Sequence, residues 1–214
     1  MPDVKVCGLC DPSDAAEAVA AGATHVGVIR VPFSRRMRSL PVARSVCMAA
    51  VGALRVGVYV DESTVTILRE ASQLGLDVIQ LHGSETPERV EALVARGLEV
   101  WKTVKPVRAE DLLASTRLYA AADLLLVEGR SDLDVWVAGP RSRWGEVAAA
   151  VDRLPPGTLL GVTGGLTPEN VGQVVRRFRP TLVDVSTGVE SERGRKDPLL
   201  VTEFISQARA TGGS

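Results

Sequence analysis

Short apolar runs alternate with longer segments of helical periodicity along the chain. Each run is short enough for a strand, and each intervening segment has apolar residues at the spacing of one helix face. The predicted strands are Val4–Cys7, His25–Ile29, Arg55–Tyr59, Val78–Leu81, Glu99–Thr103, Leu124–Val127, Leu159–Val162 and Val183–Val185. The predicted helices are Asp14–Ala21, Val42–Val51, Val65–Leu74, Pro87–Arg96, Val107–Tyr119, Trp144–Arg153, Pro168–Phe178 and Pro198–Ala210.

Local signals support several helix ends. Thr86-Pro87 and Thr167-Pro168 each place a hydroxyl residue before a proline, which is typical of a helix N-terminus. Gly75 and Gly97 stand where helix C-terminal caps are expected.

Strands that alternate with helices predict an all-parallel sheet of the α/β class. Eight such units are the number that closes a (β/α)₈ TIM barrel, and we expect one barrel domain over residues 1–214. A doubly wound open sheet is the alternative. Its dinucleotide-binding glycine pattern is missing from the first turn, residues 7–14. Residues 128–143 form the one long irregular segment, which predicts a functional loop.

The active site of such a barrel lies at the carboxyl ends of its strands. Side chains alternate along a strand, so Lys5 and Cys7 should face the interior while Val4 and Val6 face the helices. The same alternation pairs Gln80 with His82, Leu126 with Glu128, and Asp184 with Ser186. Closure makes the last strand a neighbour of the first, which brings Asp184 and Ser186 near Lys5 and Cys7.

The composition and charge of the chain argue against several classes of protein. The chain has 214 residues, of which 45% are hydrophobic and 24% charged, and its net charge is -1. Neither a nucleic-acid partner nor a membrane partner is expected, because no basic surface or long apolar segment is evident. No signal peptide is recognisable. The three cysteines are few and odd in number, so a disulfide framework is not expected. Cytoplasmic residence is therefore expected, and the Cys7–Cys10 pair is a weak metal or redox motif.

Glycine-rich loops after the last two strands predict a phosphate site. The first loop opens the helix that begins at Pro168, where backbone N–H groups and the helix terminus favour an anion. The loops after strands seven and eight are also the usual phosphate site of this barrel. The alternative is that the glycines only permit tight turns. The candidate phosphate ligands are Gly164, Gly165, Ser186, Thr187 and Gly188.

Motifs in this order resemble the phosphoribosylanthranilate isomerase family of tryptophan biosynthesis. The matching segments cover most of the chain: residues 5–9 (KVCGL), 22–27 (GATHVG), 34–36 (SRR), 55–60 (RVGVYV), 80–83 (QLHG), 163–170 (TGGLTPEN), 184–190 (DVSTGVE) and 196–197 (KD). The resemblance implies an Amadori rearrangement of N-(5-phosphoribosyl)anthranilate by acid and base catalysis, with no metal or organic cofactor. It also implies a monomer or homodimer that takes a small phosphorylated substrate.

The resemblance also implies roles for individual residues. Cys7 would be the general base, and Glu128 would replace the aspartate that usually serves as general acid. Arg36 would bind the anthranilate carboxylate, with His82 and Asp184 as further substrate contacts. Each has a plainer alternative. Cys7 could be a small buried apolar residue, Glu128 and Arg36 solvated loop charges, and His82 a hydrogen-bonded structural residue.

One region departs from the family. The glycine-rich stretch expected after strand six is replaced by residues 136–144, WVAGPRSRW, of which only Gly139 and Trp144 match. Trp136 could stack on an aromatic substrate or pack the loop against the barrel. The change leaves open a different amino-sugar phosphate as substrate. A phosphate-binding barrel without activity is a further alternative, although it would not need a thiol, an arginine and a carboxyl group together.

A thiol has a pKa near 8.5, so Cys7 needs cationic or dipolar help to hold a thiolate. Lys5 shares its strand face and is a candidate helper.

Overall fold

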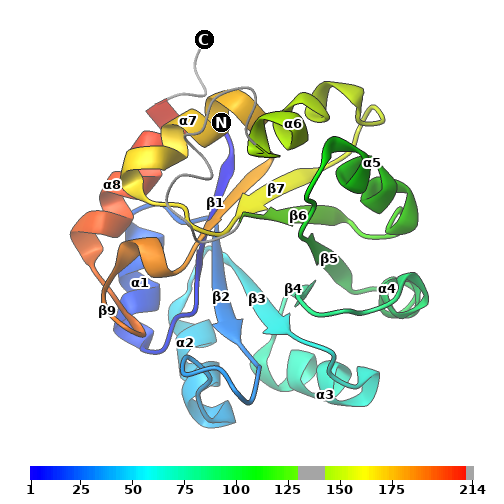
Figure 1. Ribbon diagram of the computed structural model, residues 1–214. Coiled ribbons are helices and arrows are strands. Elements are labelled where there is room, and N and C mark those ends of the chain that lie inside the picture. Colours follow the sequence, from blue (N-terminus) through cyan, green and yellow to red (C-terminus); the bar gives the residue numbers. More distant parts are fainter. Residues whose placement is uncertain (130–142, 211–214) are drawn as a thin grey trace.

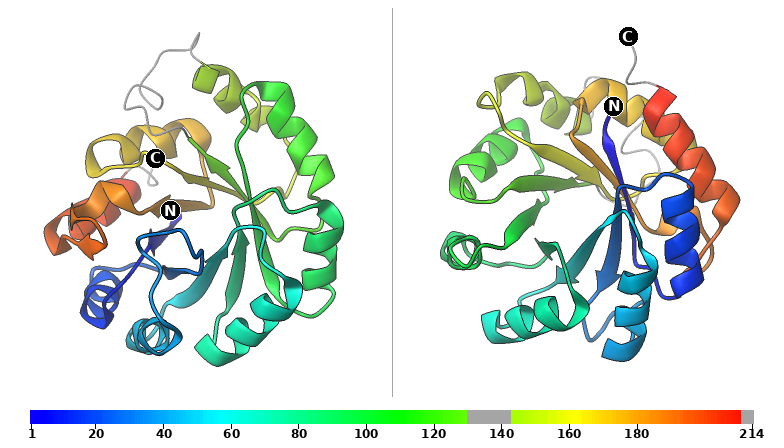
Figure 2. Two further views of the ribbon diagram at one scale, coloured as in Figure 1. Left: turned by 60° about the horizontal axis from the view of Figure 1, so that its bottom comes forward. Right: turned by 180° about the vertical axis from the view of Figure 1, so that it is seen from behind.

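Eight parallel strands close into a barrel in the computed structural model, which describes residues 1–129 and 143–210. The strands gather in the centre and the helices lie around them, as the views in Figures 1 and 2 show. The predicted (β/α)₈ TIM barrel is therefore confirmed. The barrel strands are β1 (Asp3–Cys7), β2 (His25–Ile29), β3 (Leu54–Tyr59), β4 (Val78–Leu81), β5 (Glu99–Val104), β6 (Leu124–Glu128), β7 (Leu160–Thr163) and β8 (Leu182–Val185).

The helices connect consecutive strands and cover the outside of the barrel. They are α1 (Pro12–Ala20), α2 (Leu40–Ala49), α3 (Thr64–Leu74), α4 (Pro87–Val94), α5 (Ala109–Leu118), α6 (Arg143–Ala149), α7 (Pro168–Phe178) and α8 (Pro198–Ala210). No helix within the described residues is long and apolar enough to cross a membrane.

Barrel closure pairs the first strand with the last. The register sets Lys5 of β1 opposite Asp184 of β8, and Cys7 opposite Gly27 of β2. Strand alternation then divides the side chains as predicted, because Lys5 and Cys7 face the interior while Val4 and Val6 pack outward. The first and last βα units therefore meet at one rim.

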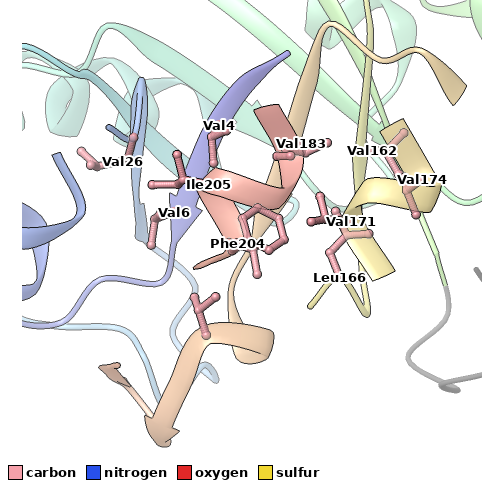
Figure 3. Packing of buried hydrophobic residues seen from close by; sticks show 14 of the residues in the cluster. Val4, Val6, Val26, Val162, Leu166, Val171, Val174, Val183, Phe204 and Ile205 are labelled. Carbon is pink, nitrogen blue, oxygen red and sulfur yellow. The ribbon is translucent and has the colours of Figure 1, made fainter. Parts of the chain in front are cut away.

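The main hydrophobic core lies between the strands and the outer helices. In Figure 3, Phe204 and Ile205 of α8 pack beside Val4 of β1 and Val183 of β8. A separate layer fills the inside of the barrel below the pocket, and it consists of Val56, Val78, Trp101, Leu124, Leu126 and Leu182. Side chains therefore fill this part of the barrel interior.

Helix ends differ from the sequence prediction where side chains take over backbone hydrogen bonds. Val107 and Arg108 were predicted to be helical, but their N–H groups donate to the Asp111 carboxylate, and α5 begins at Ala109. The predicted helix over 144–153 is also wrong as one unit, because α6 is followed by a 3₁₀ turn at Val151–Arg153.

Of the two glycines that were predicted to cap helices, one does so and the other does not. Gly75 caps α3 with a φ of 63°, as predicted. Gly97 lies beyond the end of α4, which is capped at Ala95. After β8 the chain adds a short 3₁₀ turn (Thr187–Val189) and a small hairpin of β9 (Glu190–Glu192) and β10 (Arg195–Lys196), which the sequence pattern did not predict.

Candidate active site

A pocket of about 440 Å³ opens at the carboxyl ends of the barrel strands. This volume is in the range of small-molecule sites, and the rim is where barrel enzymes place their chemistry. Its lining brings together residues that are far apart in sequence: Cys7, Ile29, Arg36, Val58, Gln80, His82, Lys105, Glu128, Gly129, Thr163, Gly164, Gly165, Leu166, Asp184, Ser186 and Thr187.

Cys7 lies at the end of β1, beside a buried ion pair. The Lys5 ammonium is fully buried and binds the Asp184 carboxylate at 3.0 Å. Asp184 also accepts a hydrogen bond from Thr163 Oγ1 at 3.1 Å. The predicted proximity of β1 and β8 side chains is thus confirmed. Asp184 lines the pocket, but its carboxylate is already engaged by two protein groups.

The surroundings of Cys7 favour the protonated thiol. Burial raises the pKa of Cys7, and the attraction of Lys5 offsets only part of this effect. Gly27 provides the space for the sulfur, because a Cβ there would lie 2.7 Å from Cys7 Sγ. All three cysteines are free thiols, so the Cys7–Cys10 pair forms no disulfide.

Glu128 lies at the end of β6, and two donor groups contact the same oxygen of its carboxylate. His82 Nε2 lies 3.1 Å from Glu128 Oε2, and Lys105 Nζ lies 2.7 Å from the same atom. Burial alone would raise the pKa of Glu128, but the hydrogen bonds and charges of His82 and Lys105 outweigh it and lower the pKa. The side chain is therefore an ionised carboxylate at neutral pH. Lys105 was not found by sequence reasoning, because a lone lysine after a strand carries no motif.

A hydrogen-bond chain across β4 and β5 fixes the His82 ring. The Gln80 amide lies 3.2 Å from His82 Nδ1 and donates to Thr103 Oγ1 at 3.2 Å. A donor at Nδ1 leaves the ring proton on Nε2, which points at Glu128. Gln80 Oε1 is buried and has no hydrogen-bond partner within the described residues, so a ligand in the pocket could supply one.

Arg36 reaches the pocket from the loop after β2 and is held by Glu190. Its Nε and Nη2 atoms donate to the two Glu190 oxygens at 2.7 Å each, which is a bidentate pair. Lys196 Nζ binds the same carboxylate at 3.1 Å. Burial raises the pKa of Glu190, but these two cations outweigh it and hold the pKa low. Gly8 makes this path possible, because a Cβ there would lie 2.7 Å from Arg36 Cδ.

The Arg36–Glu190 pair uses the Nε and Nη2 atoms of Arg36, so Nη1 takes no part in it. Glu190 belongs to a segment that the sequence analysis matched to a family motif, yet its role in orienting Arg36 was missed. A glutamate two residues after Gly188 gives no sign in the sequence of which cation it will bind.

Four of the five predicted phosphate ligands line the pocket. Gly164 and Gly165 both have positive φ, 84° and 66°, which only glycine adopts easily. The loop is tied to α7, because Asn170 accepts from the Thr167 N–H and donates to the Gly165 carbonyl, each at 2.8 Å. Ser186 and Thr187 lie on the other loop.

Gly188 is the exception among these five, because it does not line the pocket. It packs against the backbone of Leu166, where a Cβ would lie 1.9 Å from the Leu166 carbonyl oxygen. Ser186 Oγ is buried and makes no hydrogen bond to any described residue. The two loops are therefore in direct contact, with an unused hydroxyl beside them.

The divergent stretch with Trp136 and Gly139 lies outside the described residues, as does most of the loop after β6. Within residues 1–129 and 143–210, no group of three or more His, Cys, Asp or Glu side chains could hold a metal ion.

Comparison with known proteins identifies the family. The family model for N-(5'-phosphoribosyl)anthranilate isomerase matches residues 4–207. An isomerase of this name from Paracoccus denitrificans is 38% identical over 212 residues, which are 97% of each chain. One from Rubrobacter xylanophilus is 38% identical and covers 98% of this chain and 100% of its own.

Solved structures agree with the sequence relatives. A phosphoribosylanthranilate isomerase in complex with reduced 1-(o-carboxyphenylamino)-1-deoxyribulose 5-phosphate has a TM-score of 0.85 and 32% identity, covering 98% of this chain and 100% of its own. The dimeric enzyme from Thermotoga maritima, in a form with monomers generated from it, gives a TM-score of 0.84 and 33% identity over 98% and 100%. The chain belongs to the N-(5'-phosphoribosyl)anthranilate isomerase family.

Proposed function

We propose that the chain catalyses the Amadori rearrangement of N-(5-phosphoribosyl)anthranilate to 1-(2-carboxyphenylamino)-1-deoxyribulose 5-phosphate, with Cys7 as general base and Glu128 as general acid. One observation carries the assignment: a thiol and a carboxyl group line the same pocket as a carboxylate-binding arginine and two glycine-rich loops. These are the groups that an acid–base reaction on a phosphorylated amino sugar with an aromatic carboxylate requires.

The reaction has two proton transfers. Glu128 gives a proton to the ribose ring oxygen, the C1–O bond breaks, and the nitrogen lone pair forms the C=N bond of a Schiff base. Cys7 then removes the proton from C2 of the sugar. The C2–H electron pair forms the C1=C2 double bond, and the C=N pair moves to the nitrogen to give an enolamine. The enolamine becomes the ketone when its C2 hydroxyl loses a proton and C1 gains one. No electrons are gained or lost overall, so the step is an isomerisation.

Substrate binding has to change the protonation of both groups. Burial keeps Cys7 as a thiol, while His82 and Lys105 keep Glu128 as a carboxylate. The reaction needs the opposite state, a thiolate and a carboxylic acid. Lys5 is already beside Cys7, so its charge is available to the thiolate when the proton leaves. A substrate that displaces water around Glu128 raises its pKa in the required direction.

Binding groups surround the reacting atoms. We propose that Arg36 takes the anthranilate carboxylate and that the two glycine-rich loops take the phosphate. His82 and Asp184 line the same pocket and are proposed as contacts of the sugar. Gly188 supports the phosphate loops by packing on Leu166 rather than by facing the pocket.

The test is the decay of anthranilate fluorescence on addition of enzyme to freshly made phosphoribosylanthranilate. Cys7→Ala should abolish turnover. Cys47→Ala is the matched control, because Cys47 is a buried cysteine that does not line the pocket, and this variant should keep wild-type turnover. If the folded wild-type protein gives no decay, the substrate is a different amino-sugar phosphate. Full activity of Cys7→Ala would refute the role of Cys7 as general base.

Assembly and location are part of the same proposal. We propose a monomer or a homodimer, which analytical ultracentrifugation distinguishes, because a dimer has twice the mass of the 22.7 kDa chain. Cytoplasmic residence is supported by the three free thiols. Fractionation of cells that make the protein tests this location.

A further inference from the structure

Lys105 differs from the other lysines of the chain. The chain has four lysines, and three of them are buried against carboxylates: Lys5, Lys102 and Lys196. Lys105 follows β5 at the rim, and its side chain is 63% exposed. It also lines the pocket, so its charge is placed at the site rather than inside the protein.

The fold gains little from this exposed cation. Ion pairs between exposed side chains stabilise proteins weakly, because water screens them and both side chains lose freedom. The Lys105–Glu128 contact is nevertheless short, at 2.7 Å, and its acceptor is a pocket-lining carboxylate. The contact therefore acts on the site more than on folding.

The geometry restricts the Glu128 side chain, which has several rotatable bonds. Lys105 approaches Oε2 from β5, and His82 approaches the same oxygen from β4. Two donors that follow two neighbouring strands therefore hold one oxygen of the carboxylate. Positions of reacting groups matter at about the 1 Å scale, where misplacement costs roughly a hundredfold in rate.

We propose that Lys105 is a positioning residue for Glu128, which holds the carboxyl group in one orientation at the pocket. The inference rests on the proposed function, because it assumes that Glu128 takes part in the reaction. Lys105 acts through Glu128 and not by binding the substrate. Its removal should therefore change kcat and leave KM nearly unchanged.

A double-mutant cycle tests the dependence of Lys105 on Glu128. Lys105→Met should lower kcat about tenfold with KM within twofold, and Lys105→Arg should recover most of kcat because it keeps a donor. In the Glu128→Gln background, Lys105→Met should have no further effect. Arg108→Met is the control, because Arg108 is an exposed cation near Lys105 that pairs with Asp111 and does not line the pocket.

A second measurement separates the orientation of Glu128 from its protonation. Carboxyl ¹³C NMR of the folded protein should show a higher pKa for Glu128 in Lys105→Met and no change in Arg108→Met. Because a higher pKa favours the acid form that the reaction needs, a fall in kcat in Lys105→Met reports lost orientation and not a lost proton. The proposal is overturned if Lys105→Met raises KM, keeps kcat, or lowers kcat by the same factor in the Glu128→Gln background. If Glu128→Gln alone has wild-type activity, the role of Glu128 in the proposed function fails instead.

Discussion

Gly188→Ala is expected to disrupt phosphate binding by pushing two loops apart. A Cβ at this position would lie 1.9 Å from the carbonyl oxygen of Leu166, whereas real Cβ atoms keep at least 3.0 Å. The obstacle is backbone, so the loop after β8 or the loop after β7 has to move by about 1 Å. Because these loops carry Gly164, Gly165 and Ser186, the movement changes the spacing of the proposed phosphate donors.

The magnitude follows from that displacement. A shift of about 1 Å in a binding arrangement costs on the order of a hundredfold, or roughly 2.7 kcal/mol of transition-state binding. We expect kcat/KM for phosphoribosylanthranilate to fall by about this factor, mainly through KM. The inhibition constant for inorganic phosphate as a competitive inhibitor should rise in parallel, because phosphate probes the loops without the rest of the substrate.

The control is Gly97→Ala, which has open space around its Cβ but a positive φ of 76°. This variant should lose thermal stability through backbone strain and keep kcat/KM within about twofold. Steady-state kinetics measures kcat/KM, inhibition by inorganic phosphate measures binding at the loops, and circular dichroism measures thermal stability. A folded Gly188→Ala variant with unchanged phosphate inhibition and kcat/KM within threefold would refute the argument.

Three further outcomes are expected. Because burial raises the pKa of Cys7, its alkylation by iodoacetamide, followed by peptide mass spectrometry, should be slow at pH 7 and reach half-maximal rate only above the ordinary thiol pKa of about 8.5; half-maximal reactivity below that pH would contradict this. Glu190→Gln should raise KM about tenfold with little change in kcat, because the neutral amide keeps only one acceptor for Arg36 and no charge; an unchanged KM would count against the role of Glu190. Lys102→Met leaves the Glu85 carboxylate buried without its cation and should lower the free energy of unfolding in urea by about 3–5 kcal/mol, unlike Arg108→Met. The pKa of Glu85 is held below its usual value, so this stabilisation is present in the wild type above about pH 5 and should be lost as the pH falls through the folded-state pKa.

Most of the fold could be predicted from local pattern. Strand alternation placed Lys5 and Cys7 inside the barrel and Val4 and Val6 outside, because a side-chain period of two leaves no other choice once one face is buried. Eight repeats then favoured a closed barrel over an open sheet. Helix ends were less predictable, since Asp111 captures two N–H groups by a side-chain contact that apolar spacing does not encode.

The site was predictable at the positions where motifs meet the strand ends. Cys7, Glu128 and His82 were placed at one rim because β1, β6 and β4 all end there. The contacts made by these site residues were not predictable, because they depend on which long side chains reach across the rim. The Lys105–Glu128 and Arg36–Glu190 pairs join residues 23 and 154 positions apart, and nothing in either segment specifies its partner.

The Lys5–Asp184 pair lies on the seam where the two ends of the barrel meet. The partners are 179 residues apart in the chain, so this pairing must wait until nearly the whole sequence has been synthesised and folded. Until then β1 has no partner on one side, and Lys5 has no buried anion. The ion pair beside Cys7 therefore exists only in the completed ring, and partly folded chains carry Cys7 and Lys5 without Asp184.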